Sequence, residues 1–133
     1  MTEHHSGSCL CGAIRYETSG PLRPVLYCHC GMCRRFHGHY GAYTAVSADK
    51  LRLSGTVEPR WYQSSGVASR GFCPNCGSSL FWRRKDSDRI SIAAGSLDGP
   101  TGLATAGHIY TADQGDYYEI EGDAPRWPGS ASG

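Results

Sequence analysis

The chain of 133 residues lacks any long apolar run. Its polar N-terminus carries His4 and His5 but no hydrophobic segment of the kind found in signal peptides, and no later stretch is apolar enough to cross a bilayer. Cytoplasmic residence is therefore the default expectation. The reducing conditions of the cytoplasm keep thiols free to bind metal.

An excess of charge of either sign is also missing. The chain has 13 lysines and arginines against 12 acidic residues, a net charge of +1, so binding to nucleic acid or to an anionic membrane surface is not expected. Lysine is scarce, with only Lys50 and Lys85. The remaining basic residues are arginines, which bind carboxylates through paired N–H donors, although a compositional bias of the source genome explains the excess equally well.

A sustained helical pattern is absent as well. Abundant glycine, short apolar stretches and alternation with a period of two predict a mainly β chain. Strands are expected at residues 13–17, 39–46, 51–53, 60–62, 67–72, 78–83, 90–94 and 106–111, with one helical turn at residues 34–37. The length fits a single domain over residues 1–127, and the Pro-, Gly- and Ser-rich residues 128–133 are expected to be disordered.

The chain is rich in cysteine at short spacings. Its seven cysteines form a C-x-C pair, a C-x-C-x2-C trio and a C-x2-C pair, namely Cys9 and Cys11, then Cys28, Cys30 and Cys33, then Cys73 and Cys76. An odd number of cysteines at such spacings argues against a disulfide framework, because adjacent cysteines close almost no loop. These spacings are typical of zinc ligands.

The cysteines therefore divide into a set of four and a set of three. Two distant pairs supply four thiolates, which is enough for a closed zinc site that stabilises the fold. The central trio supplies three, so a zinc ion there keeps one position for water or substrate. His37 lies four residues after Cys33, and its spacing also permits a closed site, so spacing alone leaves both alternatives open. We predict that His37 is not a ligand but lies near the open position, because the chain turns at Gly38 into a strand.

Other residues around the cysteines form recognisable segments. They are GSCLCG at residues 7–12, CHCGMCRR at 28–35, RGFCPNCGSSLF at 70–81, AGSLD at 94–98 and HIY at 108–110. In these segments the chain resembles the glutathione-dependent formaldehyde-activating enzyme family, also called the S-(hydroxymethyl)glutathione synthase family. The resemblance implies a zinc-stabilised β-tent, which is a mainly β fold of small antiparallel sheets with zinc-knuckle hairpins.

The resemblance also implies two zinc ions and an activity. A structural zinc carries over to Cys9, Cys11, Cys73 and Cys76, and a catalytic zinc to Cys28, Cys30 and Cys33. The implied enzyme is a carbon–sulfur lyase or synthase that joins glutathione, or a similar thiol, to formaldehyde or another small electrophile. The alternative is a zinc-stabilised binding or chaperone module without catalysis, in which a fourth protein ligand closes the central site.

Four residues are candidates for substrate binding. Arg34 and Arg35 follow the central trio and Arg70 precedes the second knuckle, so each is a candidate to bind a glutathione carboxylate. His37 is a candidate to exchange protons with the incoming thiol, because an unperturbed histidine titrates near neutrality. The alternative for each is an ordinary surface side chain without a role.

Overall fold

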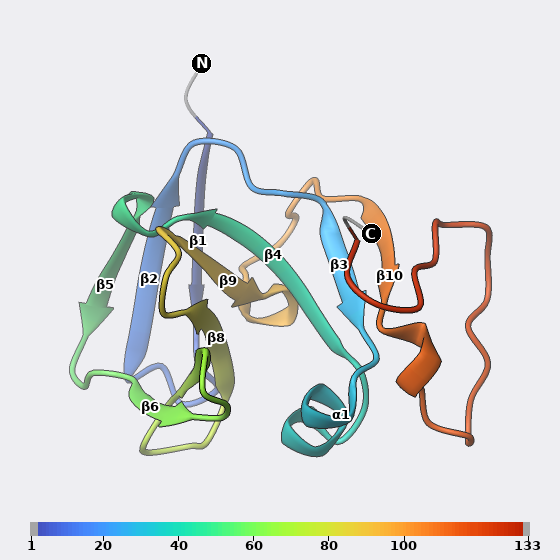
Figure 1. The fold of residues 1–133 in the computed structure, drawn as a ribbon. Helices are drawn as coiled ribbons and strands as arrows, with labels where there is room; N and C mark the ends of the chain where they lie inside the picture. Colours follow the sequence, from blue (N-terminus) through green and yellow to red (C-terminus); the bar gives the residue numbers. More distant parts are fainter. Residues whose placement is uncertain (1–2, 132–133) are drawn as a thin grey trace.

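The computed structural model of the chain describes residues 3–131 and is built mainly of strands (Figure 1). The strands are β1 (His4–Ser8), β2 (Ile14–Ser19), β3 (Val25–Cys28), β4 (Gly41–Ser47), β5 (Leu51–Gly55), β6 (Arg60–Gln63), β7 (Ala68–Phe72), β8 (Ser79–Arg84), β9 (Arg89–Ala93) and β10 (Thr105–Ile109). Within residues 3–131 there is one α-helix, α1 (Gly31–His37), which contains the predicted helical turn, and the short 3-10 turns are η1 (Ala48–Lys50), η2 (Ala94–Ser96) and η3 (Thr111–Asp113). The mainly β prediction is confirmed.

The strands form two sheets, with the orders β1-β2-β5 and β10-β3-β4-β9-β8-β7-β6. Figure 1 shows β1, β2 and β5 on the left and β3 and β10 on the right, with β4 crossing between them. Neighbouring strands run antiparallel except β10 and β3, which are parallel. The predicted antiparallel arrangement therefore has one exception. It arises because residues 94–104 carry the chain from β9, inside the sheet, to the edge beside β3.

Strand β1 was not predicted from the sequence. It pairs with β2 along its whole length, from His4 opposite Ser19 to Ser8 opposite Arg15. Its residues are polar because β1 is an edge strand, so the apolar alternation used to predict strands is missing. Gly7 is required there, since a Cβ atom would collide with the Tyr16 ring.

The main core lies between the two sheets and reaches the outer cysteine pairs. Ile14 and Tyr16 from β2 pack with Phe81 and other apolar side chains of β8 and β9, and the rings of Tyr16 and Phe81 meet edge to face at 5.5 Å. Cys9 and Cys73 are buried in the same cluster. A link between the two cysteine loops would therefore also stabilise the core.

The segment after β10 folds back beside that strand (Figure 1). The backbone N–H of Trp127 donates to the carbonyl of His108, and the N–H of Tyr110 donates to the carbonyl of Gly129. Pro128 and Gly129, which belong to the tail expected to be disordered, thus accept hydrogen bonds from the turn after β10, and residues 132–133 lie outside the described part. No helix within residues 3–131 is long and apolar enough to span a membrane.

Candidate metal centres and substrate cavity

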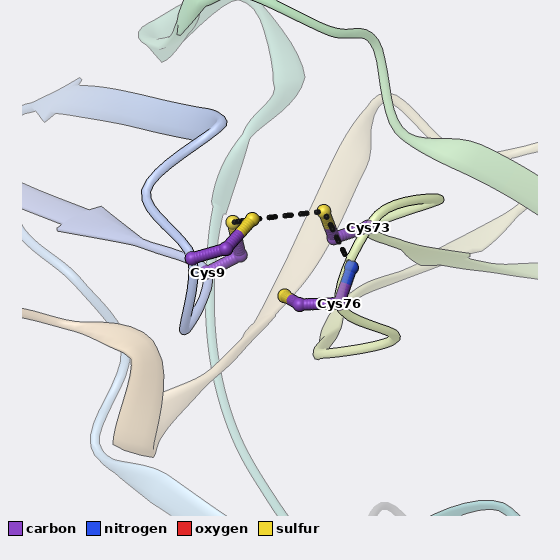
Figure 2. Close-up of side chains that lie close together, drawn as sticks. Cys9, Cys73 and Cys76 are labelled. Atoms are coloured by element: carbon purple, nitrogen blue, oxygen red, sulfur yellow. Dashed lines mark hydrogen bonds between the residues drawn. The ribbon is translucent and has the colours of Figure 1, made fainter.

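The four outer cysteines come together from two loops. Cys9 and Cys11 lie between β1 and β2, and Cys73 and Cys76 lie in the knuckle between β7 and β8; Figure 2 shows the sulfurs of Cys9, Cys73 and Cys76 converging. The four sulfurs lie within 4.8 Å of one another. The Cys9–Cys11 and Cys11–Cys73 sulfur distances are 3.6 and 3.8 Å. Four thiolates at about 2.3 Å from a zinc ion would be about 3.8 Å apart, so this donor set fits zinc.

The knuckle is shaped to present its thiolates. The sulfur of Cys73 accepts backbone N–H groups from Asn75 and Cys76, and Gly77 adopts a left-handed conformation with φ of 80°. Glycine suits this turn, because a residue with a side chain rarely adopts such a φ. The Ser78 hydroxyl lies 3.1 Å from the Cys76 sulfur, and this contact and the Ser78 backbone lower the pKa of Cys76 to about 5. These contacts favour the thiolate form of Cys76, which is the form that binds metal.

The central trio is presented by the end of β3 and the first turn of α1. Cys30 is the N-cap of the helix, and its sulfur accepts the backbone N–H of Cys33 at 3.3 Å. The sulfurs of Cys28, Cys30 and Cys33 lie within 4.8 Å of one another, and within residues 3–131 no histidine, carboxylate or further cysteine joins them. The donor set fits a zinc ion with three protein ligands and one open position.

The trio opens into a cavity of about 770 Å³. Its charged walls are mainly basic, with Arg23, Arg34, Arg70 and Arg84 against a single acid, Asp113. Its apolar walls include Met32, Trp82 and Ile109. A cavity of this size accommodates a small organic molecule, and its charge favours an anion.

His37 does not join the trio. Its Nε2 atom lies 2.6 Å from the hydroxyl of Tyr43. Burial, followed by the positive charge of Arg70, lowers the pKa of His37 to about 4, so the ring is neutral at pH 7. His37 is not among the residues lining the cavity, whereas Tyr43 is. This supports an unligated histidine, but one that reaches the cavity only through Tyr43.

We expect a His37→Ala protein to keep the zinc coordination of the parent, because the imidazole is engaged by Tyr43. X-ray absorption at the zinc edge of both proteins measures this. A Tyr43→Phe protein is the control, since it removes the same hydrogen bond and keeps the imidazole. Loss of a nitrogen scatterer in the His37→Ala spectrum would show that His37 closes the site.

The three predicted arginines have different positions. Arg34 is partly buried in α1, lines the cavity, and has an Nε atom that is buried without a hydrogen-bond partner among residues 3–131. Arg35 is exposed and does not line the cavity. Arg70, on β7, is 2% exposed and its guanidinium contacts the sulfur of Cys33. The structure therefore brings Arg34 and Arg70, but not Arg35, to the trio.

Two further arginines of the cavity were missed by sequence reasoning. Arg23 precedes β3 and donates to the carbonyl of Tyr43 at 3.0 Å, and Arg84 ends β8 and forms an exposed salt bridge with Asp86. Arg23 lies five residues before Cys28 and Arg84 eight residues after Cys76, both outside the segments around the cysteines. The pairing of the strands, rather than a local sequence pattern, brings them to the cavity.

His29 lies between two cysteines of the trio but points away from them. Its ring is 1% exposed; Nδ1 lies 2.5 Å from the hydroxyl of Tyr118 and Nε2 lies 3.0 Å from Nδ1 of His108. A second cavity of about 490 Å³ adjoins this ring. Its lining includes Tyr27, His29, Tyr40, His108 and Tyr118, together with Glu119, Glu121 and Asp123. Both ring nitrogens of His29 are occupied by neighbours, so it serves to hold the C-terminal segment against β3.

Comparisons with known proteins agree with this arrangement. The sequence profile of the glutathione-dependent formaldehyde-activating enzymes matches residues 4–113. A Halomonas elongata protein provisionally named as such an enzyme is 36% identical over 128 residues, covering 86% of this chain and 80% of that protein. An uncharacterized lyase of Schizosaccharomyces pombe is 30% identical over 79 residues, covering 59% of this chain and 56% of the other.

A solved structure supports the fold. The crystal structure of a Rhodobacter sphaeroides protein superimposes with a TM-score of 0.60 at 24% identity, covering 71% of this chain and 88% of that one. At this identity the likeness concerns the fold alone. The profile match, in contrast, spans all seven cysteines and most of the cavity. The chain therefore belongs to the glutathione-dependent formaldehyde-activating enzyme family.

Proposed function

We propose that the protein is a zinc-dependent carbon–sulfur lyase or synthase that joins an acidic thiol, such as glutathione, to formaldehyde or another small electrophile. One observation carries this proposal: a three-thiolate site, with no fourth protein ligand among residues 3–131, opens into an arginine-lined cavity. Family membership makes glutathione and formaldehyde the first substrates to test.

The metal and the cavity have separate tasks in this proposal. A zinc ion held by Cys28, Cys30 and Cys33 would supply a position at which a thiol is bound as its nucleophilic thiolate. Arg23, Arg34 and Arg84, which line the cavity, would bind the carboxylates of that thiol. Holding the sulfur and the electrophile side by side then supplies much of the rate, because two free reactants become one bound pair.

The addition also moves a proton. The thiol would release its proton to solvent on binding, and the aldehyde oxygen would gain one when the carbon–sulfur bond forms, from a donor that solvent then reprotonates. Burial raises the pKa of Tyr43, so its hydroxyl keeps its proton at pH 7. Tyr43 lines the cavity and is hydrogen-bonded to the neutral His37. This pair is the candidate donor for the oxygen.

The first test is the reaction itself. The uncatalysed addition also proceeds, so the exchange rate between glutathione and S-(hydroxymethyl)glutathione must be measured by NMR with and without protein. We expect a rate that rises in proportion to protein concentration, two zinc ions per chain, and saturable binding of glutathione. Protein that binds no glutathione and leaves the rate unchanged would favour the binding or chaperone module instead.

Replacing Arg34 with alanine is expected to weaken glutathione binding by about tenfold. A hydrogen bond to a charged group contributes roughly 1.5–3 kcal/mol, and the lower value suits a partly exposed arginine. Isothermal titration with glutathione measures the change. Arg35→Ala is the matched control, because the neighbouring arginine is exposed away from the cavity and should bind like the parent. Equal losses in the two variants would contradict the proposed contact.

A further inference from the structure

We propose that Arg70 is a positioning residue that fixes and partly neutralises the Cys33 thiolate, and thereby controls how readily the central site accepts a thiol. The inference rests on the proposed function of that site. It differs from the expectation drawn from the sequence, in which Arg70 binds a substrate carboxylate. The structure gives the guanidinium another partner, the sulfur of Cys33.

The contacts of Arg70 hold its guanidinium in one place. Nη1 and Nη2 lie 3.6 and 3.7 Å from the Cys33 sulfur, so both arms of the fork converge on one atom. Nε donates to the Ser64 hydroxyl at 3.3 Å, and the guanidinium carbon lies 5.3 Å from the centre of the Phe36 ring. The side chain is 2% exposed. A guanidinium restrained in this way is not free to turn towards a substrate carboxylate in the cavity.

Among the residues that the structure describes, no carboxylate is a counterion for Arg70. The salt bridges formed within residues 3–131 are Arg52 with Glu17 and Arg84 with Asp86, so no carboxylate there pairs with Arg70. Burying a cation is costly unless negative charge lies beside it. Both terminal nitrogens of the guanidinium face the Cys33 sulfur, at 3.6 and 3.7 Å. The sulfur of Cys33 therefore balances this buried charge.

The same charge acts on the metal site. Three thiolates and a zinc ion carry a net charge of −1, which would oppose the approach of a thiolate, and the guanidinium brings the sum to zero. Its two N–H donors also withdraw electron density from the Cys33 sulfur, so that sulfur donates less to the metal. Both effects favour a fourth, anionic ligand. Arg70 does not need to touch the substrate to produce them.

Cobalt-substituted protein tests the inference without any substrate. Arg70→Gln removes the charge and Arg70→Lys keeps the charge without the planar fork. Because the hydrogen bonds stabilise the sulfur electrons, losing them should shift the thiolate-to-cobalt charge-transfer band to longer wavelength. The matched control is Ser64→Ala, which keeps both contacts to sulfur and should leave the band in place. An unchanged band in Arg70→Gln would overturn the inference.

Two thiols then separate the two possible roles of Arg70. Glutathione has carboxylates and 2-mercaptoethanol has none. If Arg70 acts through the metal site, Arg70→Gln should weaken the binding of both thiols by the same factor, about tenfold or more. A loss confined to glutathione would overturn the inference, because it would show that Arg70 binds a substrate carboxylate. If the parent binds neither thiol, the proposed function fails, but the band shift still decides the role of Arg70.

A measurement on the unmutated protein covers the case in which the variants do not fold. In protein loaded with cadmium-113 and labelled with nitrogen-15 arginine, the guanidinium protons of Arg70 should show scalar coupling to the metal through the Cys33 sulfur. Their exchange with water should also be slow, because the group is buried. Absence of the coupling in fully loaded protein would overturn the inference.

Discussion

A Cys76→Ser protein is expected to lose one of two zinc ions and to lose most of its cooperative thermal unfolding transition. The four outer sulfurs adjoin the main core, in which Cys9 and Cys73 are buried. Structural zinc sites contribute about 10–16 kcal/mol on binding, which is comparable with the whole net stability of a domain, about 5–15 kcal/mol. A site weakened by one thiolate therefore removes much of what keeps the domain folded.

Metal analysis and thermal unfolding followed by circular dichroism measure both effects. Ser78→Ala is the matched control, since it removes the hydroxyl beside the Cys76 sulfur and leaves four thiolates. We expect this control to retain both zinc ions and to unfold only a few degrees below the parent. If Cys76→Ser retained two zinc ions and unfolded with the parent, the four cysteines would not form the structural site.

A Cys30→Ser protein is expected to keep its fold and lose its activity. Cys28 and Cys33 pack with Tyr43 in a smaller cluster apart from the main core, so the trio contributes less to folding. Serine is among the best N-cap residues and can accept the Cys33 N–H as Cys30 does, which preserves the start of α1. With only two thiolates left, the site should no longer hold its zinc. The reaction rate should then fall more than a hundredfold, towards that of the uncatalysed addition.

Zinc content, thermal unfolding and the NMR exchange rate should be measured on the same samples. One zinc ion per chain, near-parental unfolding and a background rate are the expected results. The comparison with Cys76→Ser makes the test sharp, because each variant removes one thiolate from one site. If Cys30→Ser unfolded as badly as Cys76→Ser, the central site would be structural and the proposal of an open catalytic site would lose its basis.

The division of the cysteines was predictable from the sequence because metal ligands on one loop have characteristic short spacings. The structure groups their sulfurs in the same sets of four and three. The partner of Arg70 was not predictable. Arg70 and Cys33 are 37 residues apart, and only the packing of α1 against the sheet brings them together. Proximity in the sequence to a cysteine motif made Arg70 a candidate for the site but could not indicate that its guanidinium contacts Cys33.

Local geometry explains why neighbouring residues have different positions. Consecutive residues of a helix point about 100° apart, so Arg34 faces the cavity and Arg35 faces solvent. α1 has seven residues, too few for a periodic pattern to indicate which face is inward. Consecutive residues of extended backbone point to opposite sides, so His29 lies against the second cavity while Cys28 lies at the first.

The two cysteine sites differ in how much chain each must close, and this determines when each can take up metal. Cys11 and Cys73 are 62 residues apart, and bringing such ends together costs about 4 kcal/mol of chain entropy. The ligands Cys28, Cys30 and Cys33 are near neighbours, so their closure costs little, and they leave the ribosome together before Cys73 does. The central trio can therefore be loaded on an unfolded nascent chain. Occupancy of the outer site, in contrast, would require the two distant loops to have come together.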